Sequence, residues 1–267
     1  MVCSVADETL DVDGATLAYA VQEGDGPAVV QLHGLSSSRA SEAAAGFFDW
    51  SAVTRAGRRL VRYDARGHGR STGRAEPADY AWPKLAEDLF ALLDVVSPGE
   101  PVDAIGVSMG VGTLLHALTL QPERFRRLVL VIPPTAWATR AAQGDAYRQM
   151  ATLAETQGIA GLVRAMSAFG TLPLLEEGGW TTAPPPDIAE PILPAVFRGA
   201  AATDLPAPEA IAAIRRPVLL RPWVGDPGHP VSTSDLLHDL IPDSTLEIMS
   251  TPDDLRGLGA RAADFLA

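Results

Sequence analysis

The sequence has few of the features that would direct a protein to a membrane or to an oxidising compartment. No apolar run is long enough to span a bilayer, and the first eight residues have neither the basic region nor the apolar core of a signal peptide. Cys3 is the only cysteine, so no disulfide can form within the chain. Together these absences predict a cytoplasmic location.

Positive charge is also scarce. The chain carries 33 acidic side chains against 21 lysines and arginines, and Lys84 is the only lysine. The resulting formal net charge of −12 opposes binding to phosphate backbones and anionic lipids, so we expect neither nucleic acid nor a membrane as a partner. Hydrophobic residues make up 47% of the 267 residues, which is enough for one large core with room for an inserted subdomain.

Short apolar segments alternate with helical segments along most of the chain. Most of the apolar segments lack a polar face, which is typical of strands buried on both sides. The expected strands cover residues 15–22, 27–32, 59–63, 101–105, 127–132, 217–223 and 244–249. The expected helices cover residues 41–56, 82–95, 111–118, 208–214, 232–240 and 253–266. This order predicts an α/β fold whose mostly parallel sheet has helices on both faces.

Residues 133–206 interrupt the alternation and contain no convincing strand. Their helical patches and a proline-rich loop cover residues 139–156, 159–169, 188–197 and 182–186. We interpret residues 135–205 as a helical cap inserted into a core formed by residues 1–134 and 206–267. Ligands of open α/β sheets bind at the C-terminal ends of the strands, so the cap is expected over that end. Its large side chains, which favour an apolar pocket, are Trp137, Met150, Met166, Phe169 and Trp180.

The stretch with the clearest chemical meaning is Gly106-Val107-Ser108-Met109-Gly110. It links an expected buried strand to an expected helix, and in that context G-x-S-x-G displays a nucleophile. The turn imposes a strained conformation on the serine, and the flanking glycines let two backbones pass without a Cβ clash. The competing interpretation is a glycine-rich turn with an incidental serine, and the flanking elements disfavour it.

Two further motifs occur in a matching order. His33-Gly34-Leu35 follows one expected strand, and Asp64-x-Arg66-Gly67-His68-Gly69-x-Ser71 follows the next. With the serine turn, they make the chain resemble capped α/β-hydrolases over essentially its whole length.

The resemblance implies acyl transfer, in which the Ser108 hydroxyl attacks a carbonyl carbon. It also implies that the backbone N–H groups of Leu35 and Met109 stabilise the resulting oxyanion, and that His33 shapes the oxyanion loop and is not the base. A small molecule is the expected partner, with no cofactor and no metal ion. Whether the chain forms a homodimer is left open by the sequence.

The catalytic acid is assigned by the same resemblance. In this family a carboxylate follows the first strand after the cap, and Asp226 occupies that position here. An aspartate at the start of a turn is common for purely structural reasons. The match to the family position nevertheless favours the catalytic role.

The third member of the expected triad is missing from its usual place. The family carries a histidine in the loop after the last strand, where this chain has Ser250-Thr251-Pro252-Asp253-Asp254-Leu255. That stretch is typical of a helix start, and no histidine follows His238. Without a base, a serine is a poor nucleophile at neutral pH.

His229 is the remaining candidate for the base. Asp226-Pro227-Gly228-His229 has the residues of a type II turn, which would hold the first and last Cα atoms within about 7 Å. Asp226 would then orient the imidazole of His229, while Pro230 keeps His229 out of a helix. The alternative is a histidine that lines the pocket or faces solvent. Structural or exposed positions are expected for His68, His116 and His238.

Two function classes therefore stay open. The first is a serine hydrolase that cleaves a small ester, lactone or thioester through an acyl-enzyme on Ser108. The second is a family member without hydrolytic activity, which binds a small molecule or catalyses a lyase or cyclase step in the same pocket. The two classes differ in whether a base lies within reach of Ser108.

Overall fold

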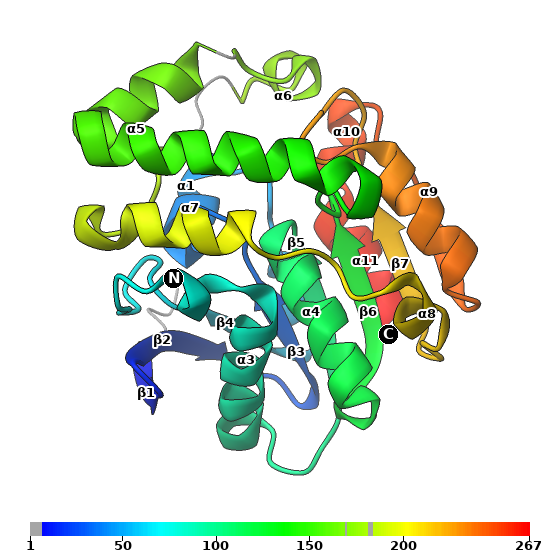
Figure 1. Ribbon diagram of the computed structural model, residues 1–267. Helices are drawn as coiled ribbons and strands as arrows, with labels where there is room; N and C mark the ends of the chain where they lie inside the picture. The colour runs from blue at the N-terminus through cyan, green and yellow to red at the C-terminus, as the bar shows by residue number, and fades with distance from the viewer. Residues whose placement is uncertain (1–6, 169, 181–183) are drawn as a thin grey trace.

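The computed structural model describes residues 7–168, 170–180 and 184–267 (Figure 1). Several residues used in the sequence interpretation lie outside the described ones, namely Cys3, Phe169, Thr182 and Ala183. No helix among the described residues is long and apolar enough to cross a membrane.

One sheet of eight strands forms the centre of the described chain, in the order β1-β2-β4-β3-β5-β6-β7-β8. Its strands are β1 (Glu8–Val12), β2 (Ala15–Gln22), β3 (Gly26–Leu32), β4 (Arg58–Tyr63), β5 (Val102–Val107), β6 (Phe125–Val131), β7 (Val218–Arg221) and β8 (Ser244–Leu246). β2 pairs antiparallel with β1 and β4, and all other neighbours are parallel. The predicted fold class is confirmed, although β1 was not predicted.

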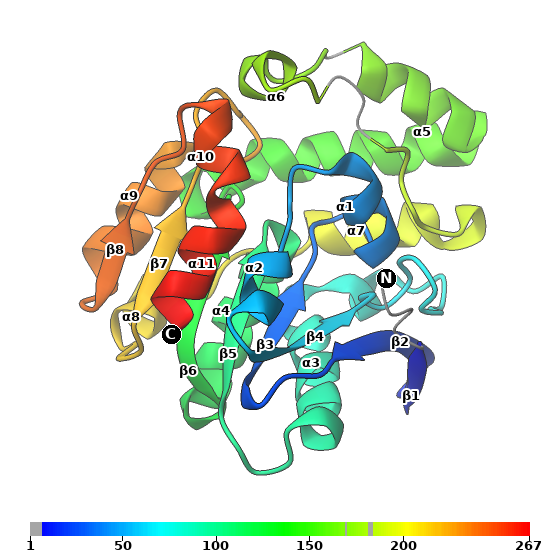
Figure 2. The ribbon, with the colours of Figure 1, turned by 180° about the vertical axis from the view of Figure 1, so that it is seen from behind.

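Helices cover both faces of the sheet. One face carries α3 (Trp82–Val96), α4 (Met109–Leu120), α8 (Pro208–Ala212) and α9 (Val231–Leu240), which share a core with the strands (Figure 1). The opposite face carries α2 (Ser51–Arg55), α10 (Pro252–Arg256) and α11 (Leu258–Leu266) (Figure 2). Strands such as β5 are buried along their whole length because side chains from both helical layers contact them.

The predicted helix over residues 41–56 is wrong. The chain instead forms α1 (Arg39–Ala45), a loop and α2. Gly46 ends α1 in the left-handed conformation, with φ at 76°, and donates its N–H to the Glu42 carbonyl. Phe48 and Trp50 then bury their rings, which stack with 5.9 Å between centroids. Burial of these aromatic rings thus overrides the helical propensity of the segment. The predicted helix over 253–266 is likewise divided at Gly257.

The chain between β6 and β7 contains α5 (Arg140–Ser167), α6 (Pro173–Glu177) and α7 (Leu193–Ala201), with short 3-10 turns at its entry and before α7. Gly158, with φ at 64° and ψ at −175°, breaks α5 into two helical pieces. The described residues of this segment contain no strand, and Ile188 forms a single bridge with His68. In both views α5 and α6 lie at the end of the molecule near α1 and α10 (Figures 1 and 2). The boundaries of a cap at residues 135–205 stay a prediction.

Candidate active site

Ser108 lies at the sharp turn between β5 and α4. Its φ of 50° and ψ of −107° are unusual for a residue with a side chain. A Cβ at Gly110 would lie 2.5 Å from the Leu32 carbonyl oxygen, and one at Gly106 would lie 2.7 Å from the Gly110 carbonyl oxygen. Only glycine fits at either position, so these two glycines let the backbones approach closely enough for the strained turn at Ser108 to form.

Ser108, His229 and Asp226 form one hydrogen-bonded chain. The Ser108 hydroxyl lies 2.7 Å from Nε2 of His229, and Nδ1 of His229 lies 2.7 Å from Oδ2 of Asp226. The structure therefore brings the three residues together in the order that a nucleophile, a base and an orienting acid require. The serine and histidine belong to segments 121 residues apart in the chain.

Asp226 is held in its ionised form. Burial acts to raise the pKa of its carboxyl group, but hydrogen bonds from His229, Trp223 and Gly228 outweigh burial and hold the pKa at about 2. Trp223 donates its indole N–H to Oδ2 at 2.8 Å, and Gly228 donates its backbone N–H to Oδ1 at 2.9 Å. An ionised Asp226 keeps a proton on Nδ1 of His229, which leaves Nε2 free to accept the Ser108 proton.

The turn that joins Asp226 to His229 differs from the predicted type. His229 donates its N–H to the Asp226 carbonyl at 3.2 Å, as a β-turn requires. Gly228 does not have the positive φ that a type II turn needs, so that prediction is wrong. The reason is the Asp226 side chain, which accepts the Gly228 N–H and fixes the turn as an Asx turn. The closeness of the two side chains does not depend on the turn type.

Two free backbone N–H groups flank the serine. Within the described part of the chain, no hydrogen bond engages the N–H of Leu35 or of Met109. Met109 begins α4, where helix N–H groups have no partner within the helix. The loop that carries Leu35 passes close by, because a Cβ on Gly34 would lie 3.5 Å from the Cβ of Ser108. This arrangement can accept a developing negative charge on an oxygen.

The remaining histidines are engaged elsewhere. His33 accepts the Ala65 N–H at Nε2 and donates from Nδ1 to the Gly34 carbonyl, at 2.9 and 2.8 Å. Burial lowers the pKa of His33 and lowers that of His68 to about 3, so both rings are neutral. His116 hydrogen-bonds the Asp204 carbonyl, and the exposed His238 hydrogen-bonds Ser244. None of these contacts involves Ser108.

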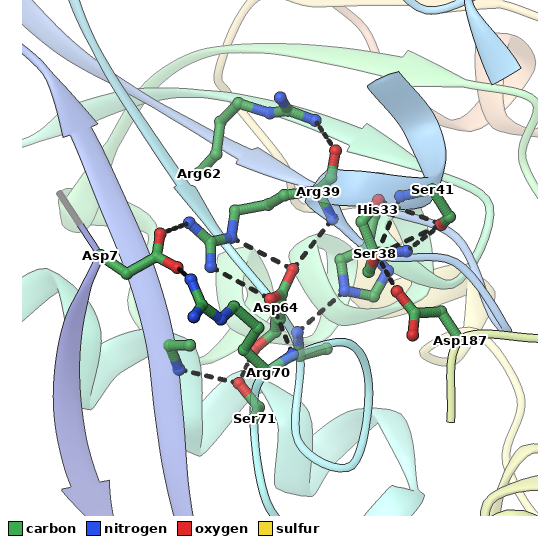
Figure 3. Close-up of polar contacts among 12 residues, drawn as sticks. Asp7, His33, Ser38, Arg39, Ser41, Arg62, Asp64, Arg70, Ser71 and Asp187 are labelled. Atoms are coloured by element: carbon green, nitrogen blue, oxygen red, sulfur yellow. Dashed lines mark hydrogen bonds and ion pairs between the residues drawn. The ribbon is translucent and has the colours of Figure 1, made fainter. Parts of the chain in front are cut away.

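The residues of the Asp-x-Arg-Gly-x-Gly-x-Ser motif hold the loop after β4 in place. Asp64 accepts hydrogen bonds from the backbone N–H of Arg39 and of Arg70, at 2.9 and 3.1 Å (Figure 3). It also forms an ion pair with the Arg39 side chain. Arg66 is fully buried and donates two hydrogen bonds to Asp88 on α3. These contacts fix the loop after β4 against the sheet and α1, and none of them reaches Ser108.

A cavity of about 310 Å³ opens beside Ser108 and His229. Large apolar side chains in its wall come from the strand ends, from the loop after α1 and from the segment between β6 and β7: Leu35, Phe47, Phe48, Ile132, Met166 and Trp223. Of the predicted pocket side chains, Met166 lines the cavity, whereas Trp137, Met150 and Trp180 do not. Phe47 and Phe48 were missed because the wrong helix over 41–56 placed them among ordinary helical residues.

Glu42 is the acidic residue in the cavity wall, and it is buried. Its carboxylate accepts hydrogen bonds from Arg62 at 3.0 Å and from Gln31 at 3.1 Å. Burial nevertheless raises its pKa from 4.5 to about 7. Between these two values the folded protein holds a proton that the unfolded chain has released, so the free energy of unfolding falls as pH rises.

We expect Glu42→Gln to remove this pH dependence. The stability of the variant relative to wild type should increase by about 2–3 kcal/mol between pH 5 and pH 8, because one pKa unit corresponds to about 1.4 kcal/mol. Urea denaturation of both proteins at the two pH values measures the difference. A stability difference that is the same at both pH values would contradict a raised pKa at Glu42.

The comparisons with known proteins agree with the fold. Residues 27–173, more than half of the chain, match the family described as the alpha/beta hydrolase fold. The chain therefore belongs to the α/β-hydrolase family, as its motifs predicted.

The individual relatives are distant. The chain is 33% identical over 133 residues to the sn-1-specific diacylglycerol lipase ABHD11 of Mus musculus, a match that covers 48% of this chain and 40% of the lipase. The chain thus spans less than half the length of the curated relatives that it matches.

Among solved structures, a hydrolase from Pseudomonas aeruginosa PA01 superimposes with a TM-score of 0.78, 24% identity and complete coverage of both chains. The enol-lactonase from Burkholderia xenovorans LB400 superimposes with a TM-score of 0.77 and 20% identity, and covers 97% of this chain and 99% of its own. At such identities the likeness concerns the fold.

Proposed function

We propose that the protein is a serine hydrolase that cleaves a small ester, lactone or thioester through an acyl-enzyme on Ser108. The observation that carries the proposal is the continuous hydrogen-bonded chain from Ser108 through His229 to Asp226, with 2.7 Å at each step. Its residues occur at a site with free N–H groups and an adjoining cavity, which acyl transfer also requires.

The first half of the reaction forms the acyl-enzyme. The Ser108 oxygen attacks the carbonyl carbon of the substrate while Nε2 of His229 takes the hydroxyl proton. The carbonyl oxygen becomes negatively charged and accepts the N–H groups of Leu35 and Met109. As the tetrahedral intermediate collapses, the imidazolium of His229 returns the proton to the leaving alcohol or thiol.

The second half repeats these roles with water. His229 takes a proton from the water molecule, whose oxygen attacks the acyl carbon, and the second tetrahedral intermediate uses the same two N–H groups. Ser108 then leaves as the alcohol after His229 returns the proton. Throughout both halves the Asp226 carboxylate stabilises the positive imidazolium and holds its orientation.

The cavity indicates the size and polarity of the substrate. Its volume of about 310 Å³ lies at the small end of ligand pockets, and most of its wall is apolar. Met166, Leu175 and Pro184, all within residues 135–205, contribute to that wall, so this segment would act as a cap over a short apolar acyl group. A diacylglycerol lipase and an enol-lactonase are among the proteins similar to this chain, which agrees with an ester or lactone substrate.

The alternative is a non-hydrolytic function, which the absence of the usual histidine would favour. His229 lies within hydrogen-bond distance of Ser108, where it can take the role of the missing histidine. This position favours hydrolysis over a lyase reaction, a cyclase reaction or simple binding.

Acyl-enzyme formation provides the direct test. With p-nitrophenyl butyrate, we expect release of p-nitrophenol and, after acid quenching, a butyryl group on the peptide that contains Ser108. The hexadecanoyl ester should react far more slowly, because a cavity of about 310 Å³ does not hold its chain. Heat-denatured protein serves as the background control. Release of p-nitrophenol no faster than this background, with no acylated peptide, would contradict the proposal.

A further inference from the structure

The loop that carries Leu35 has a conformation that its own residues do not favour. Ser37 donates its N–H to the Gly34 carbonyl at 3.2 Å, so residues 34–37 form a turn. The third residue of this turn, Ser36, has a φ of 64°, in the left-handed region. Turns with a positive φ at that position prefer glycine, and a serine there is strained. Such a turn persists when contacts from outside the loop hold it.

The two ends of the loop are held by the core. At the beginning, His33 accepts the Ala65 N–H through Nε2. At the end, Arg39 begins α1 and is bound by the buried carboxylate of Asp64 (Figure 3). These contacts leave the central residues, among them Ser36, to be held by something else.

Asp187 supplies that support from the segment between β6 and β7. Its backbone N–H donates to the Ser36 carbonyl at 2.9 Å, and its carboxylate accepts the Ser38 hydroxyl proton at 2.5 Å (Figure 3). Its own carbonyl accepts the Gly69 N–H at 2.8 Å, which ties the same residue to the loop after β4. Asp187 thus lies between two loops of the core and bonds to both.

The Ser38 side chain gives the contact a defined geometry. It is fully buried, and its oxygen also accepts the Ser41 N–H at 3.0 Å as the cap of α1. The single hydroxyl proton is therefore directed at Asp187. Without the carboxylate, the nearest alternative acceptor is the Ser41 hydroxyl at 3.3 Å, a poorer hydrogen bond.

We infer that Asp187 is a positioning residue for the oxyanion loop, and this inference rests on the proposed function. By holding Ser38 and Ser36, it keeps the strained turn in place and the Leu35 N–H directed at the oxyanion. Asp187 is not among the residues that line the cavity, so it would not touch the substrate. Its loss should therefore weaken binding of the tetrahedral state and leave binding of the ground-state acyl group in the cavity unchanged.

The test compares Asp187→Ala with Asp187→Asn. The alanine variant keeps both backbone hydrogen bonds and loses the carboxylate, so kcat for p-nitrophenyl butyrate should fall about tenfold while KM stays within about twofold. The asparagine variant retains an oxygen that can accept the Ser38 proton, and kcat should return to within about threefold of wild type. If the alanine variant does not fold, Asp187→Ser replaces it, because that side chain is too short to reach Ser38.

A second readout follows the tetrahedral state directly. Butylboronic acid adds to a serine hydroxyl and places an oxygen in the oxyanion site, so its inhibition constant should rise about tenfold in the alanine variant but not in the asparagine variant. Glu155→Ala is the matched control, because it removes an exposed ion pair with Arg198 that joins α5 to α7 within the same segment. This control should keep both kcat and boronate affinity.

The outcomes separate this inference from the proposed function. An active wild type whose Asp187→Ala variant keeps its kcat and boronate affinity would overturn the positioning role alone. An equal loss in Glu155→Ala would also overturn it, because general loosening of the segment would then be the cause. A wild type that neither cleaves esters nor binds the boronate would overturn the proposed function and the inference with it.

Discussion

Ser108→Ala is expected to lower kcat/KM for short p-nitrophenyl esters by about 10⁴-fold or more and to abolish labelling by a fluorophosphonate probe. Without the hydroxyl, no covalent bond to the acyl carbon can form, and His229 has no proton to accept. The two free N–H groups and the cavity remain, so the residual rate would come from binding and oxyanion stabilisation. Ester hydrolysis and in-gel probe fluorescence measure the two effects.

Ser232→Ala provides the matched control, since Ser232 is exposed on α9 and does not line the cavity. It should label and turn over as wild type does. Because the serine-to-alanine change removes a single oxygen, a folded Ser108→Ala protein is expected, and circular dichroism can verify it. Probe labelling that persists in Ser108→Ala would place the reactive nucleophile elsewhere.

The features that were predictable from the sequence are those encoded over short distances along the chain. Apolar runs identified the strands of the sheet from β2 onward, because a strand buried on both faces needs little else to be recognised. The elbow around Ser108 was predictable for the same reason, since Gly106 and Gly110 lie next to it in the sequence and permit the close backbone approach that the turn needs. The predicted α/β-hydrolase fold is accordingly confirmed.

Features that depend on tertiary packing were not predictable. Glycine at position 46 and burial of the aromatic rings after it divide a segment whose composition favours one helix. The predicted type of the turn at Asp226 is wrong, because the Asp226 side chain accepts the Gly228 N–H and sets the turn geometry. Nothing in the sequence indicated a role for Asp187, because its partner Ser38 lies 149 residues away in the chain.

The identity of the base was predictable from the sequence only in part. Elimination among the histidines led to His229, and the contact with Asp226 three residues earlier follows from a turn. The approach of His229 to Ser108 could not be derived, because it depends on where the loops after β5 and β7 meet. Its catalytic role stays a prediction, and its replacement has the second large expected effect.

His229→Ala is expected to lower kcat by about 10²- to 10⁴-fold while KM changes little. The hydroxyl of Ser108 remains, but no group accepts its proton at 2.7 Å. Steady-state kinetics of both proteins with p-nitrophenyl butyrate measure the loss.

His238→Ala is the matched control, because that histidine is exposed in the last turn of α9 and hydrogen-bonds Ser244 at the start of β8. It should keep the wild-type rate. If His229→Ala instead keeps its activity within a few-fold of wild type, the 2.7 Å contact with Ser108 is not the route of proton transfer. Because the described histidines other than His229 are engaged away from Ser108, that result would favour a non-hydrolytic reaction in the same cavity.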